Sequence, residues 1–272
     1  MSLTGEHKAD FSDIYVQPDP RAYVSTLQRF EYQIPQRATP IFREVIGAAR
    51  PGRVLDVCCS YGINSALLKS AGDPADVLTR YAEPGVANLS SAELAARDRE
   101  RYDGGLEIVG LDVSEPAIDY GRRSGLLTDG WAEDLESSDP TAELTKGVAD
   151  TDLVISTGGV GYVGVATFER LLRAINRPGE LWWAIFVLRV FDYSEITDLL
   201  AAHGLVTERL PGTFPQRRFA DAEEQRAAVH DVRLQGHDPE GKESAGWYHA
   251  HCYLTRPKGT ELPPHLNPPR TP

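Results

Sequence analysis

Short apolar runs alternate with helical patterns over most of the chain. The run at residues 53–57 is followed by a tight loop ending at Gly62 and by a helical stretch over residues 64–70. The order of apolar run, loop and helix recurs after three further runs, at residues 106–111, 152–156 and 181–188. Strands that alternate with helices at this spacing predict a doubly wound, mostly parallel α/β sheet with helices on both faces.

The last part of the chain departs from this order. Residues 205–210 and 247–254 have the pattern of two strands without a simple crossover between them. We therefore expect an antiparallel pair at one edge of the sheet. The charged stretch 217–236 between these strands is expected to be helical.

Three segments lie outside the repeating pattern. Residues 1–37 contain a short helix that begins with Asp19 as N-cap and Pro20 at the first position. Residues 72–105 are too long for a direct connection, and Ser90-Ser-Ala-Glu93 has the form of a capping box, so we expect a helical insertion. The proline-rich tail 258–272 is expected to be disordered. The chain thus divides into an N-terminal segment (1–37), a sheet domain (38–257) and the tail.

Composition and charge narrow the classes of function. Lys and Arg total 28 and Asp and Glu total 40, which gives a net charge of −12 over 272 residues. Such a surface repels phosphate backbones and anionic membranes, so we expect a small-molecule substrate and neither nucleic acid nor a membrane as partner. The three cysteines form no disulfide or zinc pattern, and no apolar run approaches the roughly 20 residues of a membrane span. We therefore expect a cytoplasmic protein without a metal.

The loop after the first strand carries the most informative motif. The run Val54-Leu-Asp-Val-Cys-Cys-Ser-Tyr-Gly62 resembles the first motif of class I S-adenosylmethionine-dependent methyltransferases, an acidic residue followed by a glycine-rich loop. Asp56 and Gly62 match it, whereas Cys58 and Ser60 stand where glycine is usual. Both residues are small, so the backbone could still approach a ligand closely. The resemblance implies a seven-stranded Rossmann-like sheet that binds the methionyl end of S-adenosylmethionine over residues 56–62.

The acid after the second strand extends this resemblance. Asp112 stands where the family places the carboxylate that accepts both ribose hydroxyls of the adenosyl group. A carboxylate suits a vicinal diol, because each hydroxyl supplies one donor. The alternative for Asp112 is a helix N-terminal charge or cap, a role for which Ser114 competes. Val113 is expected beside the same cofactor.

Two more loops complete the expected cofactor site. Residues 130–135 resemble the family's adenine-edge segment, so Ala132 and Asp134 are assigned to the cofactor. Trp131 stands where an acid is common, and it would either stack on adenine or belong to the core. Thr157 and Gly158 follow the fourth strand and would line the space around the sulfonium and the substrate.

A competing motif lies in this same loop. Gly159-Val-Gly161-Tyr-Val-Gly164 is a literal G-x-G-x-x-G between a strand and a helix, the pattern of dinucleotide binding. That fingerprint belongs on the first strand, with an acid about 20 residues further on, and neither condition holds here. A nicotinamide-dependent oxidoreductase is kept as an alternative. His249 and His251 share a strand face without a third ligand nearby, which favours paired histidines over a metal site.

The N-terminal segment is rich in aromatic residues. In many small-molecule methyltransferases such a segment closes over the cofactor, and aromatic faces attract a cation such as a sulfonium by roughly 0.5–2 kcal/mol. In this interpretation Arg21 pairs with a carboxylate of the cofactor, while Tyr15 and Tyr32 orient or deprotonate the reacting group. The alternative is a docked helix packing through Tyr23 and Phe30, and we assign Tyr23 to that packing.

Two reactions are compatible with these features. The first is methyl transfer from S-adenosylmethionine to a small molecule, in a secondary metabolism of bacterial type. The second is cyclisation of the cofactor's own aminobutyryl arm, a reaction that some proteins resembling this family carry out. The arm becomes 1-aminocyclopropane-1-carboxylate or azetidine-2-carboxylate, and methylthioadenosine leaves. The tyrosine-lined segment and the lack of an acceptor-recognition motif suit the cyclisation. A cofactor-binding protein without catalysis is a further alternative.

Overall fold

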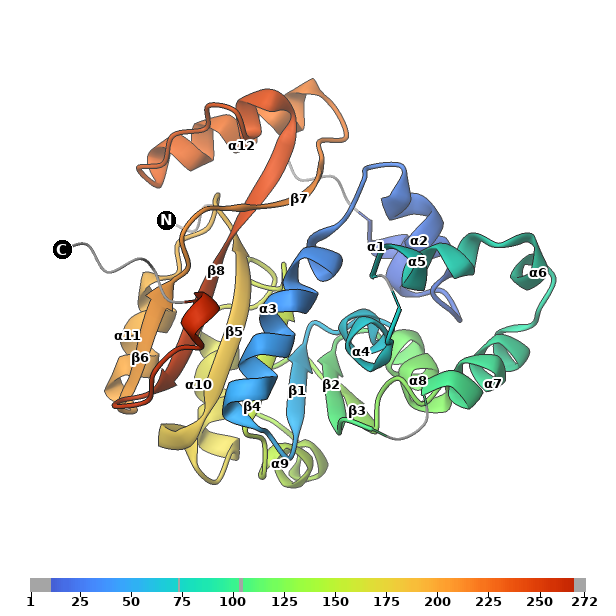
Figure 1. The fold of residues 1–272 in the computed structure, drawn as a ribbon, viewed down its shortest axis with the longest axis horizontal. Coiled ribbons are helices and arrows are strands. Elements are labelled where there is room, and N and C mark those ends of the chain that lie inside the picture. The colour runs from blue at the N-terminus through green and yellow to red at the C-terminus, as the bar shows by residue number, and fades with distance from the viewer. Residues whose placement is uncertain (1–10, 73, 103–104, 267–272) are drawn as a thin grey trace.

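The centre of the molecule is one twisted sheet of eight strands (Figure 1). The computed structural model describes residues 11–72, 74–102 and 105–266. Seven strands lie side by side in the order β3 (Asp129–Ala132), β2 (Ile108–Asp112), β1 (Val54–Val57), β4 (Leu153–Thr157), β5 (Trp182–Leu188), β8 (Trp247–Pro257) and β6 (Leu205–Arg209). The eighth strand, β7 (Phe214–Arg218), pairs with β8 off this path.

The order of the parallel strands confirms the predicted doubly wound sheet. β1 pairs in parallel with β2 on one side and with β4 on the other, so the winding direction reverses between β1 and β4. In sheets of this kind ligands bind outside the carboxyl ends of the strands at such a switch point. β8 runs antiparallel to both β5 and β6, which confirms the antiparallel edge.

The expectation of seven strands is wrong by one, because β7 gives no strand signal in the sequence. Its residues, Phe-Pro-Gln-Arg-Arg, lack apolar alternation and include a proline, which is confined to edges and irregular positions of sheets. The helix expected within 217–236 is present as α12 (Ala222–Leu234). We call residues 211–246, which leave the sheet after β6 and return to it at β8, the cap.

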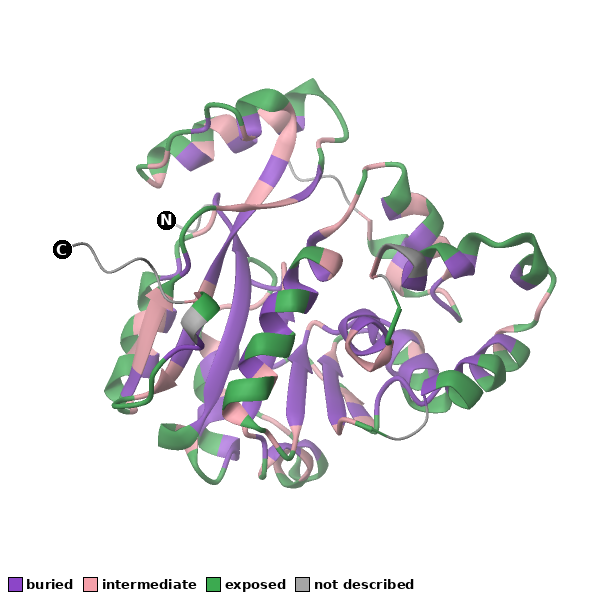
Figure 2. Cartoon of the chain, viewed as in Figure 1, coloured by how far each residue is buried: buried purple, intermediate pink, exposed green. Residues whose placement is uncertain are grey.

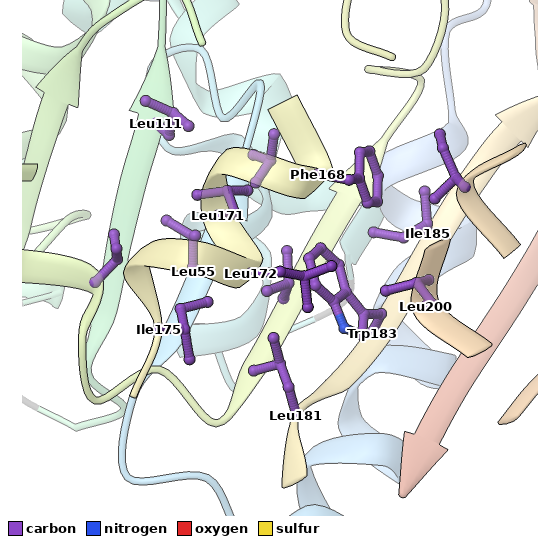
Figure 3. Packing of buried hydrophobic residues seen from close by; sticks show 14 of the residues in the cluster. Leu55, Leu111, Phe168, Leu171, Leu172, Ile175, Leu181, Trp183, Ile185 and Leu200 are labelled. Carbon is purple, nitrogen blue, oxygen red and sulfur yellow. The ribbon is translucent and has the colours of Figure 1, made fainter. Parts of the chain in front are cut away.

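Helices cover both faces of the sheet. One face packs on α3 (Ile34–Ala49), α4 (Ile63–Lys69) and α8 (Glu115–Arg123), and the other on α9 (Ala142–Val148), α10 (Val165–Ala174) and α11 (Ser194–Ala202). Every residue of β1 and β5 is buried, as expected for strands covered on both sides (Figure 2). On the α10 face the rings of Phe168 and Trp183 stack at 5.1 Å among leucine and isoleucine side chains (Figure 3).

The segment before the sheet is shorter than expected. α3 begins at Ile34 and belongs to the sheet domain, so only residues 11–33 stand apart, as α1 (Ser12–Tyr15) and α2 (Arg21–Gln28). We call residues 11–33 the lid. The expected N-cap is one residue too early, because Pro20 is the N-cap of α2 and its carbonyl accepts the first helical hydrogen bond, from Val24. Asp19, just before it, accepts a hydrogen bond from the Arg21 backbone N–H at 3.1 Å.

The predicted insertion is helical. It comprises α5 (Pro74–Thr79), the short 3-10 turn η1 (Arg80–Ala82), α6 (Pro84–Ala87) and α7 (Ser91–Tyr102). The capping box is confirmed, since Glu93 accepts from the Ser90 N–H at 2.8 Å and donates its own N–H to Ser90 Oγ at 3.2 Å. Buried Asp98 accepts from Arg80 of the insertion and from Tyr120 of α8, which fixes the insertion to the sheet domain.

Part of the expected disordered tail is folded. After β8 the chain packs back on the α3 face of the sheet, where Leu262 is only 2% exposed, and the 3-10 turn η4 (Pro264–Leu266) follows. The expectation was wrong for residues 258–266, because one buried leucine outweighs the proline content. Residues 267–272 lie outside the described residues. Two other 3-10 turns are η2 (Pro178–Glu180) and η3 (Glu243–Ala245).

No helix in the described ranges has both the length and the apolarity needed to cross a membrane.

Candidate cofactor and substrate site

Asp56 lies at the switch point and has no exposed surface. Its Oδ1 accepts a hydrogen bond from Asn64 Nδ2 of α4 at 3.0 Å, and the same amide lies 3.2 Å from Thr157 Oγ1 at the end of β4. Within the described part of the chain, Asp56 Oδ2 has no hydrogen-bond partner. Burial raises the pKa of Asp56 to about 8, although the bond from Asn64 opposes this. The carboxyl is therefore protonated at neutral pH and ionises at about pH 8.

The loop after β1 keeps a glycine-type backbone without two of the expected glycines. Cys58 and Ser60 have φ values of 58° and 51°, and Gly62 has 82°, all in the left-handed region. For a residue with a Cβ that conformation costs roughly 1–2 kcal/mol. The motif resemblance thus extends to the backbone. Ser60 Oγ is buried and has no hydrogen-bond partner among the described residues.

Asp112 holds the first two loops together. Its Oδ2 accepts the Ser60 N–H at 2.8 Å and its Oδ1 accepts the Ser114 N–H at 3.0 Å. Burial raises the pKa of Asp112, and the backbone hydrogen bonds oppose that shift. Ser114 caps α8 through its own hydroxyl, so the capping role proposed as an alternative for Asp112 belongs to Ser114. Each carboxylate oxygen of Asp112 retains a lone pair for a ligand hydroxyl.

The residues expected around adenine are only partly brought together. Val113, beside Asp112, is 70% exposed, which is unusual for an apolar side chain at the ligand edge of a sheet. Trp131 lies instead against α9, where a Cβ on Gly147 would be 1.9 Å from its ring. This packing favours the core interpretation of Trp131. Ala132 is exposed, and Asp134 accepts from Glu136 N–H and Ser137 Oγ within its own turn.

The lid places several tyrosines over these strand ends. Tyr23 contacts Tyr15, Tyr32 and Tyr61 edge to face, with ring centroids 5.6, 6.2 and 6.1 Å away. Tyr23 is buried, in agreement with its assignment to packing. Burial raises the pKa of Tyr32 to about 12 and also raises that of Tyr15. Both phenols are therefore neutral at pH 7, which favours orienting a reacting group over deprotonating it.

Hydrogen bonds hold the lid on the sheet domain. The Tyr61 hydroxyl lies 2.8 Å from the carbonyl oxygens of both Ile14 and Gln17. The Ser114 hydroxyl donates to the Tyr15 carbonyl. These contacts connect the lid to the loops that follow β1 and β2.

The Arg21 side chain, expected to pair with the cofactor, makes its hydrogen bonds within the protein. Its Nε and Nη2 donate to the Asp19 carboxylate, and its Nη1 lies 3.0 and 2.9 Å from the carbonyl oxygens of Val86 and Leu89 in the insertion. All three guanidinium nitrogens are thus engaged within the protein. The carboxylate that Arg21 pairs with is its neighbour Asp19, and its role is to join the lid to the insertion.

The cap supplies residues that the sequence did not single out. The Gln33 N–H donates to the Gln216 carbonyl at 2.8 Å, and the Arg218 N–H donates to the Phe30 carbonyl at 2.7 Å, so β7 is bonded to the end of the lid. Arg217 pairs with buried Glu224 inside the cap. Gln33 and Gln216 have no local sequence signal, because their importance comes from a contact between segments about 180 residues apart.

The G-x-G-x-x-G motif follows β4 and not the first strand. Gly161 has φ 107° and faces Phe191, whose ring would be 2.3 Å from an added Cβ. Glu136 accepts from the Gly164 N–H at 2.6 Å and from the Thr167 hydroxyl at 3.0 Å, at the start of α10. A carboxylate therefore occupies the helix N-terminus that a pyrophosphate would need, which argues against dinucleotide binding there.

The histidines on β8 have separate surroundings. His249 Nδ1 lies 2.9 Å from Thr213 Oγ1, whereas His251 contacts the ring of His237 at 4.9 Å. In the residues that the structure describes, no group of three or more His, Cys, Asp or Glu side chains could hold a metal ion.

Among the comparisons with known proteins, only the one with solved structures finds similarity. No protein-family model matches the sequence, and no curated protein matches it. A functionally unknown protein from Deinococcus radiodurans R1 is 14% identical, with 82% of this chain and 87% of that chain covered and a TM-score of 0.41. A SAM-dependent methyltransferase from Aquifex aeolicus is 13% identical over 92% of this chain and 100% of its own, with a TM-score of 0.40.

The [4+2]-cyclase SpnF is 12% identical, with 82% of this chain and 81% of that chain covered and a TM-score of 0.38. Methyltransferases are thus among the solved structures that this chain resembles. The strand order of the sheet defines the fold, and the residues at its strand ends define the candidate site.

Proposed function

We propose that the protein is an S-adenosylmethionine-dependent enzyme that transfers a methyl group to a small molecule. The observation that carries this proposal is the placement of buried Asp56 and half-buried Asp112 at the carboxyl ends of adjacent strands beneath a tyrosine-lined lid. Ligands of doubly wound sheets bind at this position.

The residues of the site fit the parts of S-adenosylmethionine. Asp112 offers acceptors to the two ribose hydroxyls, and exposed Val113 offers an apolar surface to the adenine. The unpaired oxygens of Asp56 and Ser60 suit the amino group of the methionyl arm, which has only donors. Tyrosine rings of the lid suit the positive sulfonium.

The chain's own contribution to methyl transfer is orientation and exclusion of water. When bound, the cofactor supplies a methyl group whose carbon accepts the electron pair of the nucleophile, while the electrons of the carbon–sulfur bond move to sulfur. Such a displacement needs aligned reactants in a dry site more than covalent help from the protein. The lid and the cap, bonded to each other through Gln33 and Gln216, enclose the strand ends, and neutral Tyr32 orients the reacting group.

One observation favours intramolecular cyclisation as the second candidate. An α-amino group titrates at about 8, and burial raises the pKa of Asp56 to about 8 as well. The ionised form of Asp56, which is populated at about pH 8 and above, would accept a proton from the ammonium of the methionyl arm. The freed nitrogen would form a bond to the γ-carbon, the γ-carbon–sulfur electrons would move to sulfur, and methylthioadenosine would leave. This match favours azetidine-2-carboxylate over the cyclopropane product, which requires loss of a far less acidic Cα proton.

Incubation of the protein with S-adenosylmethionine alone separates the two reactions. Release of methylthioadenosine supports cyclisation, whereas S-adenosylhomocysteine that forms only after addition of an acceptor supports methyl transfer. Binding without either product supports a non-catalytic protein. Calorimetry that detects NADH binding but no S-adenosylmethionine binding would overturn both candidates.

A further inference from the structure

Gln216 is positioned by a β-bulge in the cap strand. The register of β7 on β8 pairs Pro215 with His249 and Arg217 with Tyr248, so Gln216 is an additional residue without a counterpart. Its backbone carbonyl instead accepts the Gln33 N–H from the lid. Bulges redirect side chains and are frequent beside active sites.

The Gln216 amide reaches the carboxyl end of β4. A Cβ placed on Gly158 would lie 3.0 Å from Gln216 Nε2 and 3.4 Å from its Oε1, so the amide packs directly on this glycine. Gly158 follows Thr157, whose hydroxyl is bonded through Asn64 to Asp56. The cap strand therefore contributes a side chain to the same strand ends as the proposed cofactor site.

The amide oxygen at this position lacks a partner. Gln216 is 4% exposed, and its Oε1 accepts no hydrogen bond from residues 11–72, 74–102 or 105–266. Asp56 Oδ2 and Ser60 Oγ, at the end of β1, are unpaired in the same ranges. Buried polar atoms without partners are rare and call for an explanation. A ligand ammonium, with three donors and no acceptor, supplies the donors that such unpaired oxygens lack.

We infer that Gln216 contacts the α-amino group of the ligand's amino-acid arm, which it shares with Asp56 and Ser60. The cap then takes a direct part in ligand recognition besides enclosing the site. This inference rests on the proposed function, because it assigns a part of S-adenosylmethionine to a residue of the cap.

Two matched substitutions within the cap test the inference. Gln216→Met removes the unpaired amide while keeping the length of the side chain. The control, Gln225→Met, removes an amide that donates to the carbonyl oxygens of Glu243 and Ser244 at 3.0 and 3.1 Å. Calorimetry measures the Kd of S-adenosylhomocysteine, which carries the arm, and of methylthioadenosine, which lacks it. Thermal unfolding of the free proteins gives a readout independent of activity.

For Gln216→Met we expect the Kd of S-adenosylhomocysteine to rise about tenfold or more, because a hydrogen bond to a charged group is lost. The Kd of methylthioadenosine should change less than about twofold, and the Tm of the free protein should stay level or rise, since a desolvated unpaired group is removed. Gln225→Met should show the reverse, with a lower Tm and unchanged affinities.

The inference is overturned if Gln216→Met lowers the Tm without changing the Kd of S-adenosylhomocysteine, or weakens both ligands equally. Gln216→Glu keeps an acceptor at the same place and should preserve the affinity. A loss equal to that of Gln216→Met would show that the amide N–H makes the contact, which excludes an amino group as its partner. If the native protein binds neither ligand, the proposed function fails first and this inference fails with it.

Discussion

At the scale of single residues, the two acids of the site, buried Asp56 and half-buried Asp112, have different surroundings and should respond differently to substitution. Asp112 is held by two backbone N–H groups, whereas Asp56 has one hydrogen-bonded oxygen and one unpaired oxygen. The first arrangement suits a fixed acceptor for hydroxyl groups, and the second suits a group that exchanges a proton.

Substitution of Asp112 tests the ribose assignment. We expect Asp112→Asn to weaken binding of S-adenosylmethionine by about 2 kcal/mol, or roughly 30-fold, because a charged acceptor of two hydroxyl donors is lost. Asp134→Asn is the matched substitution. Its Kd for S-adenosylmethionine should stay within about threefold of the native value, since the Asp134 hydrogen bonds lie within its own turn. Calorimetry measures both, and equal affinities of Asp112→Asn and the native protein would refute the assignment.

The raised pKa of Asp56 predicts a pH dependence of stability with a defined sign. In the folded protein the carboxyl keeps its proton up to about pH 8, whereas in the unfolded chain it ionises near the ordinary aspartate pKa of 3.8. The folded state thus binds more protons between these values, and its free energy of unfolding falls as the pH rises through this window.

Relative to Asp56→Asn, the native protein should lose about 2–4 kcal/mol of stability between pH 5 and pH 8. Urea unfolding at the two pH values measures the difference. The exposed substitution Asp119→Asn should remove none of this dependence. Parallel stability curves for the native protein and Asp56→Asn would mean that Asp56 ionises normally.

At the scale of secondary-structure elements, the lid, the insertion and the cap depend on one another. α2 of the lid is bonded to the insertion through Arg21, and the end of the lid is bonded to β7 of the cap. Opening the site therefore requires breaking contacts on both sides of the lid, and the Arg21 side chain is one of those that hold the lid to the insertion.

Arg21→Gln should loosen the lid while leaving the sheet intact. We expect faster amide hydrogen exchange over residues 11–33 and a loss of about 1 kcal/mol in the free energy of unfolding, because a partly buried ion pair and its bonds to the insertion carbonyls are removed. Arg29→Gln, at an exposed lid position, is the control. If exchange over the lid is the same in both variants, Arg21 does not hold the lid in place.

At the scale of the whole molecule, one buried and two half-buried histidines in and beside β8 predict sensitivity to acid. Burial lowers the pKa of His249 and of His251 to about 4, and it also lowers that of His237. Unfolded histidines take up protons below about pH 6.5, before these folded ones do. The unfolded state thus binds more protons between pH 6.5 and 4, and stability falls as the pH is lowered through this range.

His251 offers the clearest test, because it is 7% exposed and is the most buried of these three histidines. His251→Phe should recover about 1–3 kcal/mol of the stability that the native protein loses between pH 7 and pH 4.5. Chemical unfolding at both pH values measures this recovery, with exposed His230→Phe as the control. A loss of the same size in native protein and His251→Phe would contradict the prediction.

The alternation of apolar runs and helical patterns in the sequence was sufficient to predict the four strands β1, β2, β4 and β5 and the doubly wound sheet. These signals are local, since a buried strand needs only a short apolar run and a helix only its own period. Asp56, Gly62 and Asp112 could be located for the same reason, because each lies within a few residues of a recognisable strand. Their positions at one edge of the sheet then follow from the parallel order.

Only the tertiary structure decided the contacts between distant segments. Arg21 pairs with its neighbour Asp19 and the insertion carbonyls, Trp131 packs on a glycine of α9, and Gln216 reaches Gly158 from a strand that has no apolar pattern. A side chain's partner depends on which backbone groups the packed fold leaves nearby, and the local sequence does not encode that. The sequence determined where the candidate cofactor site lies, whereas the packing of the lid and the cap determined which side chains stand around it.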